Sequence, residues 1–267
     1  MAIGALTACS SSGSGGSTDG KSGSDASQSA PAAGKGGAKL PPKEALLASA
    51  AVMEKAGSAK LTLKDADGGG SADYVWKDPS SFLMTSQEEG KEVKVLFVGG
   101  QMYVGATPDM AAAAKGKKWL SLDVKDGSGD SDNEVGSFAA AMQVMNPAVQ
   151  LAAAAPTATA VGTETVAGQS TTHYHSQLKA EDLAAKMNLD PALKAKALAQ
   201  IKKEGDTVSA DVWINGKGEL VQQTVVDPTA EKGGAPLTVT YSDLGQAKAT
   251  PAPTADQVFK LSDLMQQ

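Results

Sequence analysis

The feature that most constrains the fold is an alternation of apolar and polar residues in many short runs. Residues 59–64 and 208–214 alternate with a period of two, which is typical of half-buried strands. Short glycine-containing segments, such as Gly99-Gly100 and residues 215–218, separate neighbouring runs by the length of a hairpin turn. Strands joined by such turns pair antiparallel, so the sequence predicts an antiparallel meander.

Helical patterns lie before and between the alternating runs. Residues 43–56 place apolar residues on one face of a helix, and Gly57 follows as a stop signal. Further helices are expected at 135–145, at 147–155 after an Asn146 cap, and at 180–203 with a break at Asp190-Pro191. The expected strands are 59–64, 72–77, 81–86, 93–97, 102–104, 119–123, 158–165, 171–178, 208–214, 220–226 and 237–241. This order predicts an α+β fold, in which helices gather on one face of a curved antiparallel sheet.

The first 42 residues differ from the rest of the chain in composition. Residues 10–42 are rich in Ser, Gly, Ala and Lys and offer no apolar cluster that could offset the entropy of ordering them. As a flexible coil, a segment of this length has an r.m.s. reach of about 30 Å. We therefore expect a leader at 1–9, a disordered tether at 10–42 and one folded domain at 43–267.

The single cysteine of the chain lies where the leader meets the tether. Leu6-Thr7-Ala8-Cys9 resembles the lipobox of bacterial lipoproteins, in which the thiol receives a diacylglyceryl group and the peptide is cut before the cysteine. The eight residues before Cys9 contain no Lys or Arg and are short for a secretory signal, so we expect the true start to lie upstream. The alternative is an unmodified cysteine in a disordered leader.

Composition and charge exclude several classes of function. The net charge is −6 and all 24 basic residues are lysine, so the chain lacks the arginine fork that commonly contacts phosphates. This argues against nucleic-acid binding. One cysteine allows neither a disulfide within the chain nor a cysteine-rich metal site. No run approaches the roughly 20 apolar residues of a membrane span, so we expect an anchored or soluble protein without a cofactor.

Candidate catalytic and metal-binding residues are few. His173 and His175 alternate on a predicted strand and could offer two imidazoles to zinc or copper, but no acidic third ligand lies near them in sequence. We interpret them as part of an exposed polar face and expect no metal site. No serine stands in a Gly-x-Ser-x-Gly elbow, and the acidic residues at 130–134 do not complete a calcium loop. We expect no catalytic residues.

Apolar residues on the predicted strands and helices allow two interpretations. They can form an ordinary core, or they can line a slot for acyl chains between the sheet and the helices. Methionine suits the second interpretation because its flexible thioether adapts to variable ligands, and burying hydrocarbon is worth about 0.8 kcal/mol per CH₂. The candidate lining residues are Val95, Phe97, Met102, Val104, Met142, Met145, Leu183, Met187, Val212 and Ile214.

Several short motifs, taken in order, resemble the LppX/LprA/LprF/LprG family of mycobacterial-type lipoproteins. They are Lys55-Ala56-Gly57-Ser58, Val166-Ala167-Gly168 before Tyr174, Asp211-Val212-Trp213-Ile214-Asn215 before Gly218, and Tyr241-Ser242-Asp243-Leu244-Gly245 before Pro251 and Pro253. The resemblance spans roughly residues 43–265. It implies a LolA-like half-barrel that holds the acyl chains of lipids or glycolipids. Loops 106–118 and 126–133 depart from the family pattern, being rich in Ala, Lys and Gly.

Together these observations predict a monomeric lipoprotein on the extracytoplasmic face of the cell membrane. Its anchor is Cys9, its partners are lipid or glycolipid acyl chains, and it performs no reaction. An alternative from a different class is a surface sensor or scaffold that binds a protein partner, marked by an exposed apolar patch on the convex face. A hydrolase is the third possibility, and it requires a close pair of base and nucleophile.

Overall fold

The computed structural model describes residues 40–65, 68–88, 90–122, 142–189, 191–226 and 236–265. These residues belong to one compact unit that spans Gly37–Gln267. The leader, most of the tether, Cys9, the expected helix before Met142 and the loop 126–133 lie outside the described residues. The domain boundaries of the sequence analysis therefore stay predictions.

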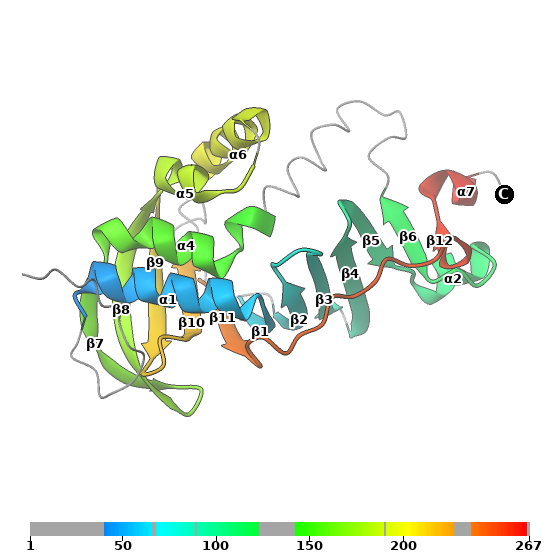
Figure 1. Cartoon of the computed structure of the whole chain (residues 1–267). Coiled ribbons are helices and arrows are strands. Elements are labelled where there is room, and N and C mark those ends of the chain that lie inside the picture. The colour runs from blue at the N-terminus through cyan, green and yellow to red at the C-terminus, as the bar shows by residue number, and fades with distance from the viewer. Residues whose placement is uncertain are drawn as a thin grey trace, which may run out of the picture. The chain divides into compact units, whose positions relative to one another are not determined.

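Twelve strands form a single sheet (Figure 1). In space they follow the order β12-β6-β5-β4-β3-β2-β1-β11-β10-β9-β8-β7, and every neighbouring pair is antiparallel except β12 and β6. The sheet does not close on itself, because β12 and β7 are its two edges. The strands are β1 (Ser58–Lys64), β2 (Gly69–Val75), β3 (Ser81–Glu88), β4 (Lys91–Val98), β5 (Gln101–Gly105), β6 (Trp119–Leu122), β7 (Thr159–Val166), β8 (Gln169–Lys179), β9 (Thr207–Asn215), β10 (Leu220–Val226), β11 (Leu237–Ser242) and β12 (Val258–Phe259). The predicted curved antiparallel sheet is confirmed.

The strand registers place the alternating apolar residues in rows across one face of the sheet. Leu61 of β1 lies opposite Ala72 of β2 and Tyr241 of β11, and all three side chains are buried. In an antiparallel pair, residues directly opposite each other point to the same face, so one alternation per strand builds one continuous apolar surface. We call this the concave face, since the helices pack on it.

The described helices include those predicted at 43–56, 147–155 and 180–203. They are α1 (Pro42–Ala56), α2 (Pro108–Ala113), α4 (Pro147–Ala154), α5 (Ala180–Lys186), α6 (Pro191–Glu204) and α7 (Leu261–Met265), with short 3₁₀ turns η1 (Ala155–Thr157) and η2 (Ala255–Gln257). Asn146 caps α4, where its side-chain oxygen accepts a hydrogen bond from the backbone N–H of Ala148. Helix α2 was not predicted, because its alanine-rich sequence resembled a loop.

Gly57 and Trp76 together close the end of α1. Gly57 adopts the left-handed conformation, with φ of 73°, and its backbone N–H donates to the carbonyl of Met53. The indole Nε1 of Trp76 donates to the same carbonyl over 3.1 Å. A helix end leaves carbonyl groups without partners, so these two donors satisfy one of them while tying α1 to the residue that follows β2.

The main core forms where α1 and α4 pack against each other and against part of the concave face (Figure 1). Leu46 and Met53 of α1 and Leu151 of α4 are almost completely buried. Their sheet partners in this core include residues of β1, β2, β8, β9, β10 and β11. Burying a side chain of this size stabilises the fold by about 1.5–3 kcal/mol.

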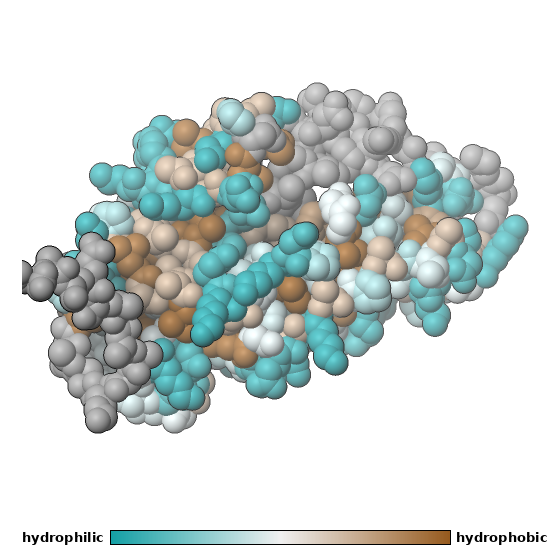
Figure 2. All heavy atoms as spheres, in the orientation of Figure 1, coloured by the Kyte–Doolittle hydropathy of each residue, from teal (hydrophilic) through white to brown (hydrophobic). Residues whose placement is uncertain are grey.

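Two smaller clusters lie away from the main core. One joins α4, α5 and α6 through Leu183, Met187 and Ala197, and hydrophobic residues also reach the surface around α5 and α6 (Figure 2). The other lies at the far edge of the sheet, where α2 packs with Leu120 and Phe259. The segment after β11 runs along the sheet to β12, and the backbone N–H of Thr250 on it donates to the Ser81 hydroxyl.

In the part of the chain that the structure describes, no helix combines the length and the apolar character that a membrane span requires.

We predict that Tyr74→Phe lowers the free energy of unfolding by about 1 kcal/mol, the usual net contribution of one hydrogen bond. The buried Tyr74 hydroxyl donates to the carbonyl of Met142 over 2.9 Å, which fixes the segment before α4 to β2. Urea denaturation measures the change. Tyr103→Phe is the matched control, since Tyr103 is only half-buried. Equal effects of the two substitutions would contradict the role of this hydrogen bond.

We also predict that stability declines above about pH 10, the ordinary pKa of tyrosine. Burial raises the pKa of Tyr74 and the pKa of Tyr241 well above that value. The folded state therefore keeps protons that the unfolded state releases, so the stabilisation present below pH 10 is lost as pH rises. Urea midpoints on either side of that pH measure the decline. It should be shallower in Tyr241→Phe, and an unchanged slope would contradict the prediction.

Candidate apolar binding site

The concave face of β3, β4 and β5 carries apolar side chains that no described helix covers. Its central row runs from Met84 through Val95 to Val104, which lie directly opposite one another in the strand registers. Val93 and Met102 lie on the same face of β4 and β5. All five are only partly buried, unlike the residues under α1 and α4. We call Met84, Val93, Val95, Met102 and Val104 the open strip.

A packed cluster bounds the open strip on each side. Toward β2, Phe82 and Phe97 are buried in the main core, and the ring of Phe82 meets the edge of Tyr74 with ring centres 5.6 Å apart. Toward β12, Leu120 lies opposite Val104 and packs with Phe259 and α2. The open strip is therefore continuous with both clusters but belongs mostly to neither. Val93, Val95 and Val104 pack in none of the three clusters.

The structure distributes the predicted lining residues over several places. Val95, Met102 and Val104 lie on the open strip, and Phe97 lies at its border. Met142, Met145, Val212 and Ile214 belong to the main core beneath the helices. Leu183 and Met187 lie apart from both, in the cluster of α4, α5 and α6. The role of these ten residues in holding a ligand stays a prediction. Those on the open strip are Val95, Met102 and Val104, and all three are partly exposed.

Three residues of this surface were not among the predicted ones. Met84 of β3 lies in the row of Val95 and Val104, and Ser86 of β3 and Val93 of β4 form the next row on the same face. Residues 92–95 alternate and so signal Val93, whereas residues 82–86 are three apolar residues followed by two polar ones. The local pattern alone did not reveal this surface. The pattern became informative only through the strand register, which shows which residues of neighbouring strands meet.

On the convex face, a second cluster surrounds His173. Its Nδ1 lies 2.9 Å from Glu164 Oε1 and its Nε2 lies 2.8 Å from Asp211 Oδ1. The imidazole also stacks on Trp213 with ring centres 4.4 Å apart, and the Trp213 indole donates to the other oxygen of Glu164. His175 shares Asp211 through its Nδ1 at 3.1 Å. Three strands, β7, β8 and β9, are thus joined side chain to side chain.

The convex cluster adds contacts that the sequence analysis could not foresee. Acidic partners do lie beside the histidines, but they come from β7 and β9 across the sheet rather than from nearby sequence. Within the described residues, no group of three or more His, Cys, Asp or Glu side chains is arranged to hold a metal ion. The carboxylates instead accept hydrogen bonds from the imidazoles and the indole.

Hydrolytic chemistry requires a nucleophile beside one of these histidines. In the described part of the chain, the side-chain partners of the two imidazoles are Glu164, Asp211 and Gln177, and no serine or threonine hydroxyl is among them. The buried Ser176 hydroxyl donates instead to the backbone carbonyl of Ala154. Neither imidazole is therefore paired with a hydroxyl nucleophile in this part of the chain.

The convex face is polar at β10 and β11, whereas on β3, β4 and β5 it carries Leu83, Leu96 and Tyr103, of which Leu96 is buried. Thr224 and Thr238 approach each other through their hydroxyls, and Thr240 donates to Gln222. A shallow cavity of about 340 Å³ on β1, β2 and β3 is lined largely by Lys60, Thr62, Ser71, Asp73 and Thr85. The composition of these polar parts gives no support to the alternative of a partner-binding apolar patch.

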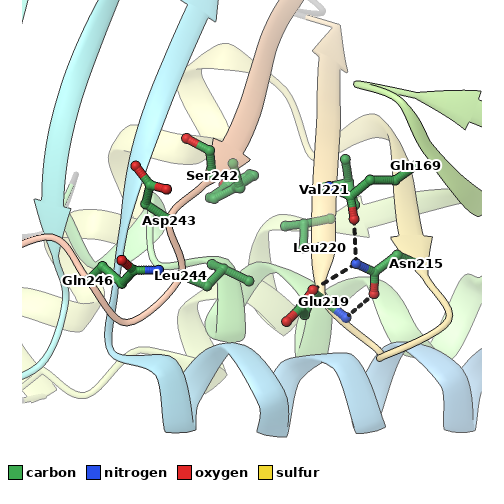
Figure 3. A pocket seen from close by; sticks show the side chains of 10 residues that line it. Gln169, Asn215, Glu219, Leu220, Val221, Ser242, Asp243, Leu244 and Gln246 are labelled. Carbon is green, nitrogen blue, oxygen red and sulfur yellow. Dashed lines mark hydrogen bonds between the residues drawn. The ribbon is translucent and has the colours of Figure 1, made fainter.

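A polar pocket opens where β10 and β11 separate (Figure 3). Its volume is about 210 Å³, below the roughly 300–1,000 Å³ of common small-molecule sites. Asn215 organises one wall of the pocket. Its amide donates to Gln169 and to Glu219, and its oxygen accepts from the backbone N–H of Glu219 (Figure 3). The same oxygen also accepts from the backbone N–H of Lys217. A cavity this small and this polar does not suit an acyl chain.

These features define a class of protein: an open, curved antiparallel sheet whose concave face is partly filled by helices and partly apolar and half-exposed. LprF from Mycobacterium bovis has a similar structure, with a TM-score of 0.52, 13% sequence identity, and coverage of 80% of this chain and 97% of that one. At this identity the similarity establishes the fold. The resemblance stated from the sequence motifs is confirmed at that level.

Two further solved structures are more distant. LppX from Mycobacterium tuberculosis, described as a lipoprotein, is 20% identical, covers 79% of this chain and 98% of its own, and has a TM-score of 0.45. A LolA superfamily protein from Nitrosomonas europaea is 10% identical, covers 80% and 96%, and has a TM-score of 0.28. No protein-family model matches the sequence, and no curated protein matches it either.

The open strip and the filled core should respond differently to the same truncation. We predict that Val95→Ala lowers the free energy of unfolding by less than about 1 kcal/mol, because Val95 is already half-exposed. Val212→Ala should lower the free energy of unfolding by about 1–2.5 kcal/mol more than Val95→Ala does, because it leaves a cavity beneath the helices. Thermal or urea unfolding of the two variants measures both changes. Equal losses of unfolding free energy would show that Val95 is an ordinary core residue.

Proposed function

We propose that this protein binds the acyl chains of lipids or glycolipids on the concave face of its sheet, as a carrier that performs no reaction. The observation that supports the proposal most directly is the open strip. A soluble fold ordinarily buries a row of Val and Met that its own strands assemble, and here the row is half-exposed beside a well-packed core.

The energetics of such binding fit the residues present. Hydrocarbon transfer from water is worth about 0.8 kcal/mol per CH₂, so one long chain supplies enough free energy without a charged clamp. This agrees with a chain that has no arginine. Met84 and Met102 supply flexible side chains, which can adjust to acyl chains of different shape.

In this proposal the N-terminal segment anchors the carrier. Acylation of Cys9 would hold the domain at the extracytoplasmic face of the membrane, and residues 10–42 would set how far it reaches. The protein would act as a monomer. The sensor or scaffold alternative requires an exposed apolar patch on the convex face, and the parts of that face on β10 and β11 and in the cavity on β1 to β3 are mainly polar.

We predict that the full chain carrying Cys9→Ala, purified from cells under native conditions, contains lipid without a covalent bond to it. Organic extraction followed by mass spectrometry identifies the lipid, and the substitution removes signal from the protein's own anchor. The substituted protein should also leave the membrane fraction. Membrane retention would refute the lipobox interpretation, and absence of lipid would count against the carrier function.

A pair of substitutions in β4 tests the site itself. Val95 points to the concave face and Val98 to the opposite one, since they lie at odd and even positions of the same strand. We predict that Val95→Asp removes most of the bound lipid, because a carboxylate in the open strip must give up its hydration when hydrocarbon covers it. Val98→Asp, which adds the same charge, should retain the lipid. Equal retention would place the ligand elsewhere.

A further inference from the structure

One hydroxyl on the concave face has no partner. The Oγ of Ser86 is buried, and among the described residues nothing hydrogen-bonds to it. Buried hydroxyl groups almost always find a partner, so an unsatisfied one calls for a physical reason. Ser86 lies in β3, on the same face as Met84 and two residues beyond it toward the hairpin that joins β3 to β4.

The two residues directly opposite Ser86 offer its hydroxyl no side-chain donor or acceptor. In the strand registers it lies between Val93 of β4 and Gly70 of β2, so one side is apolar and the other has no side chain. A Cβ built on Gly70 would lie only 3.4 Å from the Cβ of Ser86, which shows how close the bare backbone runs. The same Cβ would lie 2.9 Å from the carbonyl oxygen of Thr85, so β2 closes this flank of Ser86, and the open strip is the side from which a ligand would approach the hydroxyl.

The burial along β3 and β4 changes in one direction. Phe82 and Phe97 are buried in the main core, Met84 and Val95 are half-exposed, and Lys91 at the hairpin is exposed. A chain lying along this gradient would place its hydrocarbon end against the two phenylalanines. Its more polar end would then lie in the row of Ser86 and Val93.

We propose that Ser86 is a specificity residue of the acyl-binding site, whose hydroxyl donates a hydrogen bond to the carbonyl oxygen of an acyl ester. This inference rests on the proposed function and adds that the protein recognises the ester carbonyl of its ligand. A neutral ester fits better than an ionised free acid, because the open strip contains no cation and Lys91, one row beyond Val93 on the same face, is exposed rather than buried beside Ser86. Binding would thus satisfy the hydroxyl that is unsatisfied in the free protein.

A comparison of two uncharged ligands of equal size tests the role of Ser86. Methyl laurate and pentadecane have the same number of heavy atoms, and only the first carries an ester. Their dissociation constants are measured by equilibrium partitioning with mass spectrometry on the full chain carrying Cys9→Ala, with and without Ser86→Ala. The preference for the ester over the alkane should fall about three- to tenfold in Ser86→Ala, the effect of losing one hydrogen bond.

Ser49→Ala is the matched control. The hydroxyl of Ser49 is the other described side-chain group that is buried without a partner, but it lies on α1 in the filled half of the fold. This substitution should leave the preference for the ester unchanged. Both variants should fold as stably as the parent, since removing an unsatisfied hydroxyl breaks no bond, and a thermal melt verifies it.

Each outcome of the experiment is informative. A preference lost in Ser86→Ala and kept in Ser49→Ala supports the inference. If Ser86→Ala keeps the full preference while both ligands bind, the inference is overturned and the proposed acyl-binding function stands. If neither ligand binds the parent protein, the proposed function fails, and the role of Ser86 fails with it.

Discussion

The size of the sheet relative to its helices is the constraint on which the other features depend. Twelve strands at the usual spacing of about 4.8 Å make a concave face about 53 Å wide along its curve. Helix α1, with 15 residues, is about 22 Å long and runs across the strands (Figure 1). It packs side by side with α4, so together they fill only part of that face. The remainder includes the open strip.

The border between the filled and the open parts is held by aromatic side chains and backbone carbonyls. The ring of Tyr74 contacts the rings of Trp76 and Phe82, and its hydroxyl donates a hydrogen bond to the carbonyl of Met142. The indole N–H of Trp76 donates a hydrogen bond to the carbonyl of Met53 at the end of α1. Both interactions bring polar groups into the core only where a partner satisfies them. Because these polar groups are satisfied, the main core stays packed next to an apolar row that is partly exposed.

The two faces of the sheet differ in chemistry. The concave face collects Val, Leu, Met and Phe, whereas the convex face of β8 to β11 presents Thr, Gln and His to water; on β3 to β5 the convex face also carries Leu83, Leu96 and Tyr103. On the convex side, His173, Glu164, Asp211 and Trp213 join three strands near the β7 edge of the sheet. On the concave side, the same sheet leaves one serine hydroxyl among apolar neighbours. Polar groups are therefore abundant and paired on one face, and rare on the other.

The sequence by itself determined the elements, because period, caps and glycine turns are local signals: α1 ending at Gly57, α4 beginning after Asn146, and the antiparallel strands. It missed α7, and it missed α2 although Thr107 and Pro108 are a cap and a first-turn signal. Only the tertiary structure decided which apolar residues meet. Val95 and Val212 are indistinguishable as alternating valines, yet one lies on the open strip and the other beneath the helices. Likewise the partners of His173, and the absence of a partner for Ser86 among the described residues, depend on strand registers. Those registers join residues far apart in the chain, so no local pattern encodes them.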